Sequence, residues 1–445
     1  MRHLFWCVLF AALSSVLACG SSSAGGASPV PDAGPLGSTT AGSSSGSGGG
    51  ASSSGGSLGS TSSSSGGRSG SGSSGSSSGG PPAPDDAGAT RDGGNLSGLT
   101  PQQFVKAMSP GWNLGNTYDA DPNETSWGNP ETTQAMIQAV HAAGFNTVRI
   151  PVTWTDHIGA APSYTIDPAW MAKVEQVATW VNQAGMYAIV NTHHDADGQW
   201  ILFDDPGTNT TSLSAENQAQ ITTEIGAVWT QIATAFNGYG DHLIFECFNE
   251  PHGNVNGYGG GDAPSRAILN AYLAACMSAI RGTAGNNATR YVMVQGLGAA
   301  AAQVSIQAVV VPNGDPNVLF SVHNYFPWSF ASGSTTTWGQ ASDYTDMSSM
   351  LQQVVSWLPP DEGIVLGEWG TVSADDLDSR VAYTGAYAQD ITNAGMCPII
   401  WDDGGDFQLL NRGTNPPSWQ YPTILSALMT GYQTGTMAGA GFAHL

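Results

Sequence analysis

One local pattern recurs along this chain and limits the folds that it can adopt: a helix with one apolar face, a glycine, and then a buried strand. The junctions share the signatures Ala143-Gly144-Phe145, Ala184-Gly185-Met186 and Ala394-Gly395-Met396. Glycine commonly follows the end of a helix, because it adopts the left-handed backbone conformation that satisfies the last carbonyl groups. Helices that alternate with apolar strands are typical of α/β proteins with parallel sheets.

The helix starts in this pattern are marked as well. Asn129-Pro130-Glu131 predicts a start, with an N-cap residue, a proline at the first helical position and an acidic residue in the first turn. Asp167-Pro168 predicts the start of the next helix, and apolar residues then recur there at helical spacing.

Eight segments are strand candidates: residues 111–116, 147–153, 188–192, 243–248, 291–295, 319–323, 364–366 and 398–401. Eight helix–strand units in one domain of this size predict a (β/α)8 TIM barrel. A doubly wound open sheet is the alternative, but no glycine-rich phosphate loop opens any of the helices.

The first 19 residues are predicted to be an export signal. A basic start precedes an apolar run over residues 4–12, which is too short to span a membrane stably. The run leads into Val16-Leu17-Ala18-Cys19-Gly20, which resembles the bacterial lipoprotein cleavage box, with Cys19 as the lipidated residue. An ordinary signal peptide is the alternative. We expect an exported lipoprotein at the cell surface or outer membrane or, in the alternative, a secreted protein.

Residues 20–95 are predicted to be a disordered linker. Over residues 21–80 they are almost wholly Ser, Gly and Ala, with too little apolar surface to offset the entropy of ordering. Residues 96–445 then form the folded domain, which we expect to be a single barrel.

The charge of the chain limits its partners. The net charge is −23 at pH 7, although only 10% of the residues are charged. This composition disfavours nucleic acid and anionic lipid surfaces as direct partners. A membrane would therefore be contacted only through the lipid anchor, and we expect a monomer.

The cysteines are few and widely spaced. Besides Cys7 and Cys19 in the predicted signal, the chain has Cys247, Cys276 and Cys397, which allow at most one disulfide. We expect all three to be unpaired, buried thiols. The chain has no Cys-x-x-Cys motif or Cys/His cluster of the kind that holds a structural metal.

Two glutamates follow apolar, strand-like runs. Glu250 lies in Phe248-Asn249-Glu250-Pro251 after the fourth predicted strand, and Glu368 lies in Leu366-Gly367-Glu368-Trp369-Gly370 at the seventh. In a barrel, the C-terminal ends of all strands meet at one face, where active sites form. Two carboxyl groups facing each other across that face are the minimum equipment for cleaving a glycosidic bond.

The chain resembles the glycoside hydrolase family 5 cellulases over nearly the whole domain. The matching motifs occur in the family's order: Gly111-Trp112-Asn113-Leu114-Gly115-Asn116-Thr117, Glu124-Thr125-Ser126-Trp127-Gly128-Asn129-Pro130, Val148-Arg149-Ile150-Pro151-Val152-Thr153-Trp154, Asn191-Thr192-His193-His194, Asn249-Glu250-Pro251, His323-Asn324-Tyr325 and Gly367-Glu368-Trp369-Gly370. The first three are most similar to the subfamily 4 branch, which acts on cellulose, mixed-linkage glucan and xyloglucan. The resemblance implies an endo-β-1,4-glucanase without a cofactor, whose partner is a β-glucan polysaccharide.

The resemblance also assigns roles to the two glutamates. Glu250 corresponds to the general acid/base and Glu368 to the nucleophile of a retaining mechanism, for which we predict carboxyl groups about 5–5.5 Å apart. Arg149 and Tyr325 are expected to hydrogen-bond Glu368 and hold it ionised, while His323 lies near Glu250 and tunes its proton.

Other residues of these motifs are expected to bind or support the sugar. Asn249 is expected to bond the 2-hydroxyl group, His193 to orient Arg149 or the nucleophile, and Trp401 to form the floor under the reacting sugar. The further candidates for sugar contacts are Asn116, Trp154, Trp127, Trp200 and His157.

The sequence leaves three alternatives. His193-His194-Asp195 has the residue types of a metal site, but no His-Glu-x-x-His motif is present and the family needs no metal. A xyloglucanase or β-mannanase would use the same glutamates, because specificity lies in the loops. A non-catalytic glycan-binding surface lipoprotein is the alternative from another class of protein.

Overall fold

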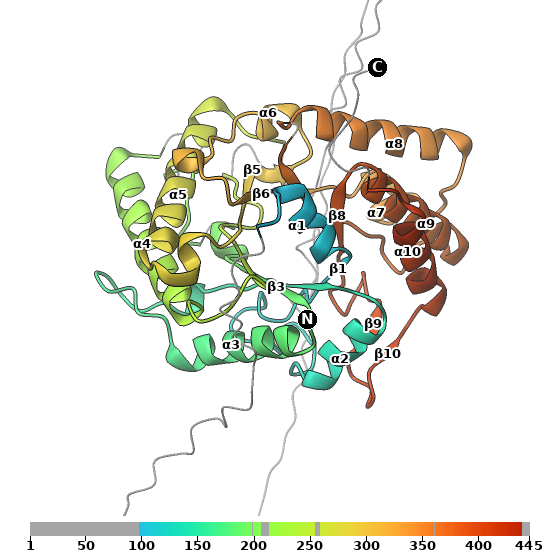
Figure 1. The fold of residues 1–445 in the computed structure, drawn as a ribbon, viewed down its shortest axis with the longest axis horizontal. Helices are drawn as coiled ribbons and strands as arrows, with labels where there is room; N and C mark the ends of the chain where they lie inside the picture. The colour runs from blue at the N-terminus through green and yellow to red at the C-terminus, as the bar shows by residue number, and fades with distance from the viewer. Residues whose placement is uncertain (1–97, 198, 206–212, 254–258, 360, 438–445) are drawn as a thin grey trace, which may run out of the picture. The chain divides into compact units, whose positions relative to one another are not determined.

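The computed structural model describes residues 98–197, 199–205, 213–253, 259–359 and 361–437 (Figure 1). Within these residues, eight parallel strands close into a barrel in the order of the sequence. They are β1 (Gly111–Asn113), β2 (Thr147–Ile150), β3 (Tyr187–Asn191), β4 (Leu243–Glu246), β5 (Val292–Ala300), β6 (Val318–His323), β7 (Gly363–Glu368) and β8 (Met396–Ile400). The predicted (β/α)8 barrel is confirmed. The predicted signal, Cys19 and the linker over 20–95 lie outside the described residues.

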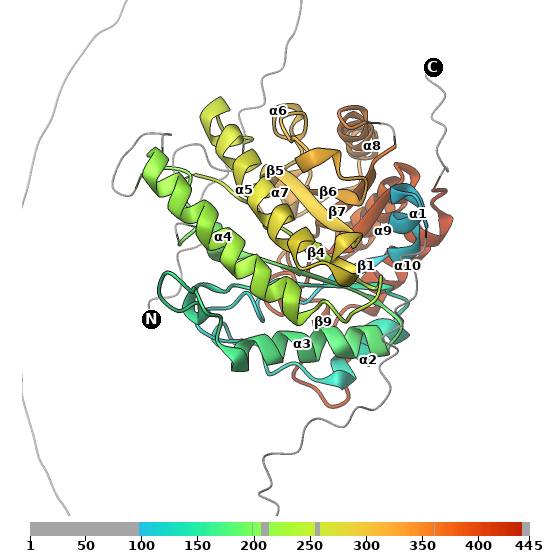
Figure 2. The same ribbon diagram turned by 60° about the vertical axis from the view of Figure 1, so that its left-hand side comes forward.

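Helices surround the barrel (Figures 1 and 2). They are α1 (Pro101–Met108), α2 (Gln134–Ala142), α3 (Pro168–Gln183), α4 (Ala215–Ala235), α5 (Ala263–Gly282), α6 (Gln303–Ile306), α7 (Trp328–Ala331), α8 (Ala341–Ser356), α9 (Leu377–Asn393) and α10 (Pro422–Thr434). A short antiparallel pair, β9 (Leu410–Asn411) and β10 (Ser418–Trp419), follows the barrel strands. Among the helices of the described residues, none has both the length and the apolar character needed to cross a bilayer.

The apolar residues form two cores. The larger core lies between the strands and the outer helices, and it includes Val148 and Ile150 of β2. The smaller core fills the barrel interior, where inward residues such as Ile189, Ile244 and Leu319 pack against Phe104 of α1. In Figure 1, α1 lies over the middle of the barrel. Alternate residues of each strand therefore serve different cores, which is why the strands are largely apolar on both faces.

The helix–glycine–strand junctions have the expected backbone. Gly144, Gly185 and Gly395 directly follow the C-cap residues of α2, α3 and α9, and their φ angles are 101°, 85° and 76°. The predicted start of α3 is also correct, because the Asp167 side chain accepts a hydrogen bond from the Ala169 amide at 2.9 Å.

The predicted start of α2 at Asn129 is wrong. The helix begins at Gln134, with Thr133 as its N-cap. The Asn129 side chain instead donates to the carbonyl oxygens of Asn116 and Asp403, at 2.8 Å each. Its amide thus joins the loops after β1 and β8, a tertiary use that the local sequence pattern does not reveal.

Several strands end earlier than predicted. β1 ends at Asn113, β2 at Ile150 and β4 at Glu246, whereas β7 continues to Glu368. Glu368 is therefore the last residue of its strand, and Glu250 lies four positions beyond β4, in the following loop. A loop position is consistent with Pro251, because proline donates no backbone hydrogen bond to a strand ladder.

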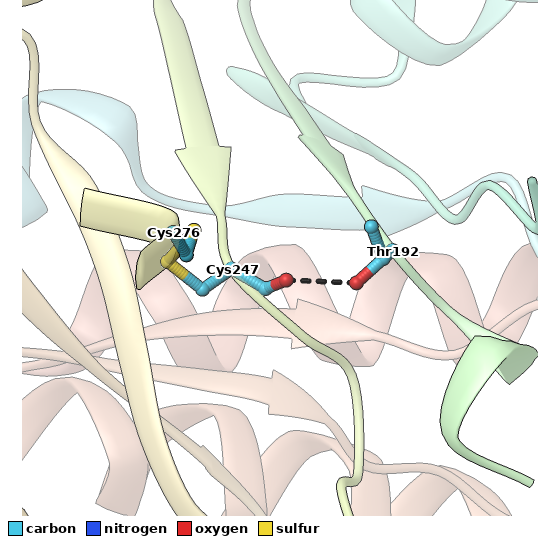
Figure 3. Close-up of a disulfide and its surroundings, with 3 residues drawn as sticks. All are labelled: Thr192, Cys247 and Cys276. Carbon is cyan, nitrogen blue, oxygen red and sulfur yellow. Dashed lines mark hydrogen bonds between the residues drawn. A yellow bond between two sulfur atoms is a disulfide. The ribbon is translucent and has the colours of Figure 1, made fainter. Parts of the chain in front are cut away.

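The prediction of three unpaired thiols is also wrong. Cys247, directly after β4, forms a disulfide with Cys276 of α5 across a Cα–Cα distance of 6.1 Å (Figure 3). The Thr192 hydroxyl donates to the Cys247 carbonyl at 2.7 Å from the end of β3. Of the cysteines in the described residues, only Cys397 is free, and it lies in the barrel interior. The disulfide therefore fixes the segment three residues before Glu250.

We expect this disulfide to contribute about 3.6 kcal/mol to the free energy of unfolding, because it closes a loop between cysteines 29 positions apart. Urea denaturation of the double variant Cys247→Ala/Cys276→Ala measures this loss. Reduction of the wild type with dithiothreitol is expected to lower its urea midpoint by nearly as much as the double substitution does.

Cys397→Ala is the matched control, since it removes a buried thiol that is not in a disulfide. Reduction is expected to lower the urea midpoint of Cys397→Ala by about as much as it lowers the midpoint of the wild type. A wild-type midpoint that does not respond to the reductant would contradict the assignment.

Candidate active site

The inward face of the barrel changes from apolar to polar toward the C-terminal ends of the strands. On β6, Leu319 belongs to the interior apolar core, whereas Ser321 and His323, two and four residues later, are buried polar residues. On β4, Ile244 is followed in the same way by the fully buried Glu246. Strand side chains alternate between faces, so this change marks the layer where the candidate site begins.

Glu368 ends β7 and is bound on both of its carboxylate oxygens. The Arg149 Nη1 donates to Oε1 at 2.7 Å, and the Tyr325 hydroxyl donates to Oε2 at 3.0 Å. Both predicted hydrogen bonds are confirmed. Burial raises the pKa of Glu368 above its ordinary value, while the nearby His323 and Arg149 act in the opposite direction.

Glu250 has a different environment. Its Oε1 lies 2.7 Å from His323 Nδ1, which confirms the predicted proximity of these two residues, and 21% of its side chain is exposed. Burial is the main influence that raises the pKa of Glu250 to about 7, against the lowering effect of His252. Such a carboxyl group retains its proton near neutral pH and can donate it.

The two carboxyl groups lie close together. One oxygen of Glu250, one oxygen of Glu368 and a nitrogen of His323 are all within 4.8 Å of one another. This close approach favours a retaining mechanism, because inverting enzymes keep their carboxyl groups about 6.5–9.5 Å apart to accommodate a water molecule.

Arg149 joins the residues of the site. Besides Glu368, its guanidinium donates to Asn249 Oδ1 at 2.6 Å, to Asn113 Oδ1 at 3.0 Å, and from Nε to Glu246 Oε2 at 2.7 Å. Sequence reasoning missed Glu246. Its signal was a single acidic residue within the apolar run of β4.

Asn249 is positioned by this contact. Because its Oδ1 accepts from Arg149, its Nδ2 is the group that remains to donate to a sugar hydroxyl. The predicted contact with the 2-hydroxyl group thus has a suitable donor.

His193 lies in the site and connects to Arg149 through intermediate side chains. Its Nδ1 pairs with the Nδ2 of Asn191 at 3.2 Å, and the same Nδ2 donates to Glu246 at 2.9 Å. The His193 ring lies parallel to that of Trp401, with centroids 6.0 Å apart. Its link to Arg149 therefore passes through Asn191 and Glu246.

Trp401 follows β8 and is half-buried at the mouth of the barrel. A Cβ on Gly115 would lie 2.6 Å from its ring, so glycine is required there for the ring to keep this position. Asn116, the next residue, has a left-handed backbone with φ of 53°, and its amide donates to Asp119 at 3.0 Å. Both Trp401 and Asn116 remain candidates for sugar contact.

Trp154 is not a sugar-stacking residue, contrary to the prediction. Its side chain is fully buried, and its Nε1 donates to the Asn191 carbonyl at 2.9 Å. His157 stacks on the buried Trp170 at 3.9 Å, which gives it a packing role. Trp127, in contrast, is 47% exposed, and its ring lies 5.4 Å from that of His194.

Asp119, His193 and His194 bring their side-chain ligand atoms within 4.8 Å of one another. Because Asn191 Nδ2 donates to His193 Nδ1, the proton of the neutral ring is on Nε2, the nitrogen that faces Asp119 at 4.0 Å. Burial disfavours the charge of His194, but hydrogen bonds to Asp119 and Asp197 outweigh this and raise its pKa to about 10. Hydrogen bonds and ion pairs within the protein thus account for the side chains of this cluster.

Two closely spaced carboxyl groups, one with a pKa raised to about 7 and the other bound by an arginine and a tyrosine, define the site of a glycoside hydrolase on a (β/α)8 barrel. The family model described as Cellulase (glycosyl hydrolase family 5) matches residues 114–406.

Known proteins agree with this match. Endoglucanase B of Clostridium cellulovorans is 41% identical over 348 residues, which are 75% of this chain and 76% of that protein. The solved structure of a GH5-4 broad specificity endoglucanase from Clostridium acetobutylicum is 39% identical, with a TM-score of 0.69 over 74% of this chain and 99% of its own. The structure of the GH5-4 broad specificity endoglucanase from Ruminococcus champanellensis, with bound cellotriose, is 34% identical. It has a TM-score of 0.69 and covers 74% of this chain and 98% of its own. The chain belongs to glycosyl hydrolase family 5 and is a cellulase-type glycoside hydrolase.

We expect kcat/KM to depend on pH with a bell shape. Activity falls above about pH 7 as Glu250 loses the proton that it must donate. Activity also falls at low pH, where Glu368 becomes protonated. Because burial raises the pKa of Glu368, this acid limb is expected at a higher pH than an ordinary carboxyl group would give. Initial rates on an aryl β-cellobioside with a poor leaving group measure both limbs.

Glu250→Ala separates the two limbs. With a 2,4-dinitrophenyl leaving group, which departs without protonation, the alkaline limb of kcat/KM is expected to disappear while the acid limb remains. Persistence of the alkaline limb would contradict the assignment of that limb to Glu250.

Proposed function

We propose that this protein is a retaining endo-β-1,4-glucanase in which Glu250 is the general acid/base and Glu368 the nucleophile. The observation that carries the proposal is the close pair of carboxyl groups, with Arg149 and Tyr325 bound to Glu368 and His323 bound to Glu250. The non-catalytic alternative is disfavoured, because each carboxyl group has the partners that its catalytic role requires.

The reaction has two steps. Glu368 attacks the anomeric carbon while the proton of Glu250 passes to the leaving glycosidic oxygen, which forms a glycosyl–Glu368 ester and releases one part of the chain. Glu250, now ionised, removes a proton from water, whose oxygen attacks the anomeric carbon and releases Glu368. Proton and bond changes balance over the two steps, and the configuration is retained.

Tyr325 and Arg149 provide the electrostatic support for Glu368. The Tyr325 ring is held by edge-on contacts with Trp328 and Phe407, at centroid distances of 6.1 and 5.7 Å. Burial and the adjacent carboxylates raise the pKa of Tyr325, so its hydroxyl remains a donor throughout the working pH range.

The substrate that we propose is a soluble β-1,4-glucan, cleaved internally, with mixed-linkage glucan and xyloglucan as further substrates. Support comes from the broad specificity printed for the GH5-4 relatives and from a solved family 5 xyloglucanase from Paenibacillus pabuli, which is 32% identical to this chain. We also propose that the enzyme acts as a monomer.

Azide rescue is expected to distinguish the roles of the two glutamates. With an activated aryl β-cellobioside, Glu250→Ala plus azide should yield the β-glycosyl azide, because azide replaces water on the intermediate. With a cellobiosyl substrate, Glu368→Ala plus azide should yield the α-azide by direct displacement. Without azide, hydrolysis of barley β-glucan should fall about 10²–10⁴-fold for Glu250→Ala.

Glu216→Ala, an exposed glutamate in the first turn of α4, is the matched control and should retain wild-type activity. The reverse pattern of azide products would show that Glu250 is the nucleophile and Glu368 the general acid/base, contrary to the proposal. Wild-type enzyme that cleaves none of carboxymethylcellulose, barley β-glucan, xyloglucan and mannan would overturn the proposed function.

We also propose that Cys19 carries a lipid that holds the enzyme at the cell surface through the Ser/Gly-rich linker. The expected result is that Cys19→Ser moves the protein from the membrane fraction to the soluble fraction and abolishes labelling by palmitate. Cys7→Ser, within the predicted signal, is the matched control and should leave both unchanged. Membrane partitioning and labelling that persist in Cys19→Ser would contradict the anchor.

A further inference from the structure

A third carboxylate lies behind the catalytic pair. Glu246, the last residue of β4, is fully buried and both of its oxygens accept hydrogen bonds. Its Oε2 accepts from Arg149 Nε at 2.7 Å and from Asn191 Nδ2 at 2.9 Å, and its Oε1 accepts from the Ser321 hydroxyl at 2.8 Å. A buried carboxylate is strongly disfavoured unless it is paired in this way.

Arg149 is shared between this carboxylate and the nucleophile. Its Nε binds Glu246 and its Nη1 binds Glu368, at 2.7 Å each. The guanidinium is fully buried, so water screens neither ion pair to any large extent. One positive charge thus serves two carboxylates, and each pair weakens the hold of Arg149 on the other.

A carboxylate that is bound too tightly is a poor nucleophile, because its electron pair is stabilised before the reaction begins. Glu368 must therefore be oriented by Arg149 without losing its reactivity. We propose that Glu246 is a positioning residue that limits how strongly Arg149 holds the charge of Glu368. The proposal rests on the proposed function, in which Glu368 attacks the sugar.

Glu246 acts at a distance from the sugar. The titratable or charged residues that interact with Glu368 or Glu246 come from β2, β6 and the loops after β4 and β6: Arg149, His323, Tyr325 and Glu250. Of these, His323 lies with Nδ1 3.7 Å from Glu368 Oε2 and is mainly bonded to Glu250. Glu246 differs from them in that it reaches Glu368 through the shared guanidinium.

The test uses the full-length enzyme and 2-deoxy-2-fluorocellobiosyl fluoride, whose fluoride leaves without a proton from Glu250. The rate of covalent trapping therefore reads only the state of Glu368 as the pH is varied. Glu246→Gln replaces the carboxylate with a neutral group of the same shape, so that Glu368 is the one carboxylate that still forms an ion pair with Arg149. We expect the acid limb of trapping to move to lower pH by ~0.5–1 unit, with a slower plateau rate.

A second variant predicts the opposite sign and preserves the charge. Ser321→Ala removes a donor from Glu246 Oε1, which leaves more negative charge to attract Arg149 away from Glu368. We expect the acid limb to move to higher pH by ~0.2–0.5 unit. If Glu246→Gln does not fold, this variant alone decides the proposal, and a limb that stays in place or moves down overturns it.

Asp315→Asn is the matched control. It breaks another arginine–carboxylate pair, with Arg281 at 2.7 Å, at the end of the barrel opposite the candidate site. Its trapping profile should match the wild type. Wild-type enzyme that is never labelled on Glu368, as read by peptide mass spectrometry, refutes the proposed function itself. Labelled wild type with an unchanged acid limb in Glu246→Gln refutes only the role of Glu246.

Discussion

The guanidinium of Arg149 is the interaction on which the candidate site depends. It is fully buried and donates hydrogen bonds to Asn113 of β1, Glu246 of β4, Glu368 of β7 and Asn249 in the loop after β4. Burial acts to lower the pKa of Arg149, but the charges of Glu246 and Glu368 outweigh it and raise this pKa. Because an isolated buried charge would be prohibitively costly, the arginine and its two carboxylates have to be present together.

The same network explains how two glutamates with identical side chains can have different chemistry. Glu368 is held by charged and hydroxyl donors deep in the barrel, whereas Glu250 lies in a loop, partly exposed and next to a histidine. The Cys247–Cys276 disulfide and the Thr192 hydroxyl fix the end of β4 just before this loop. A loop position thereby gains enough rigidity to hold a proton donor opposite the nucleophile, which is the demand that catalysis makes.

Much of the fold could be predicted because its signals are local. The glycines after α2, α3 and α9 and the apolar runs between them depend only on short stretches of backbone, and all eight strands were predicted. Errors arose where a residue's partner is distant in sequence. Asn129 has the residue type of an N-cap but joins two loops, and Trp154 is buried by β3 although its motif lies at the cleft. The disulfide was missed because cysteine pairing depends on which helix covers β4.

By itself, the sequence determined the alternation of helices and parallel strands, the two glutamates and the motifs around them, because backbone propensity and motif order are properties of neighbouring residues. Only the tertiary structure decided that Glu246 shares Arg149 with Glu368. These residues belong to β2, β4 and β7, which are not adjacent in the barrel. Their side chains meet only because closure of the sheet turns alternate positions of every strand toward a common interior, and strand order and register, rather than local sequence, set which of them come together.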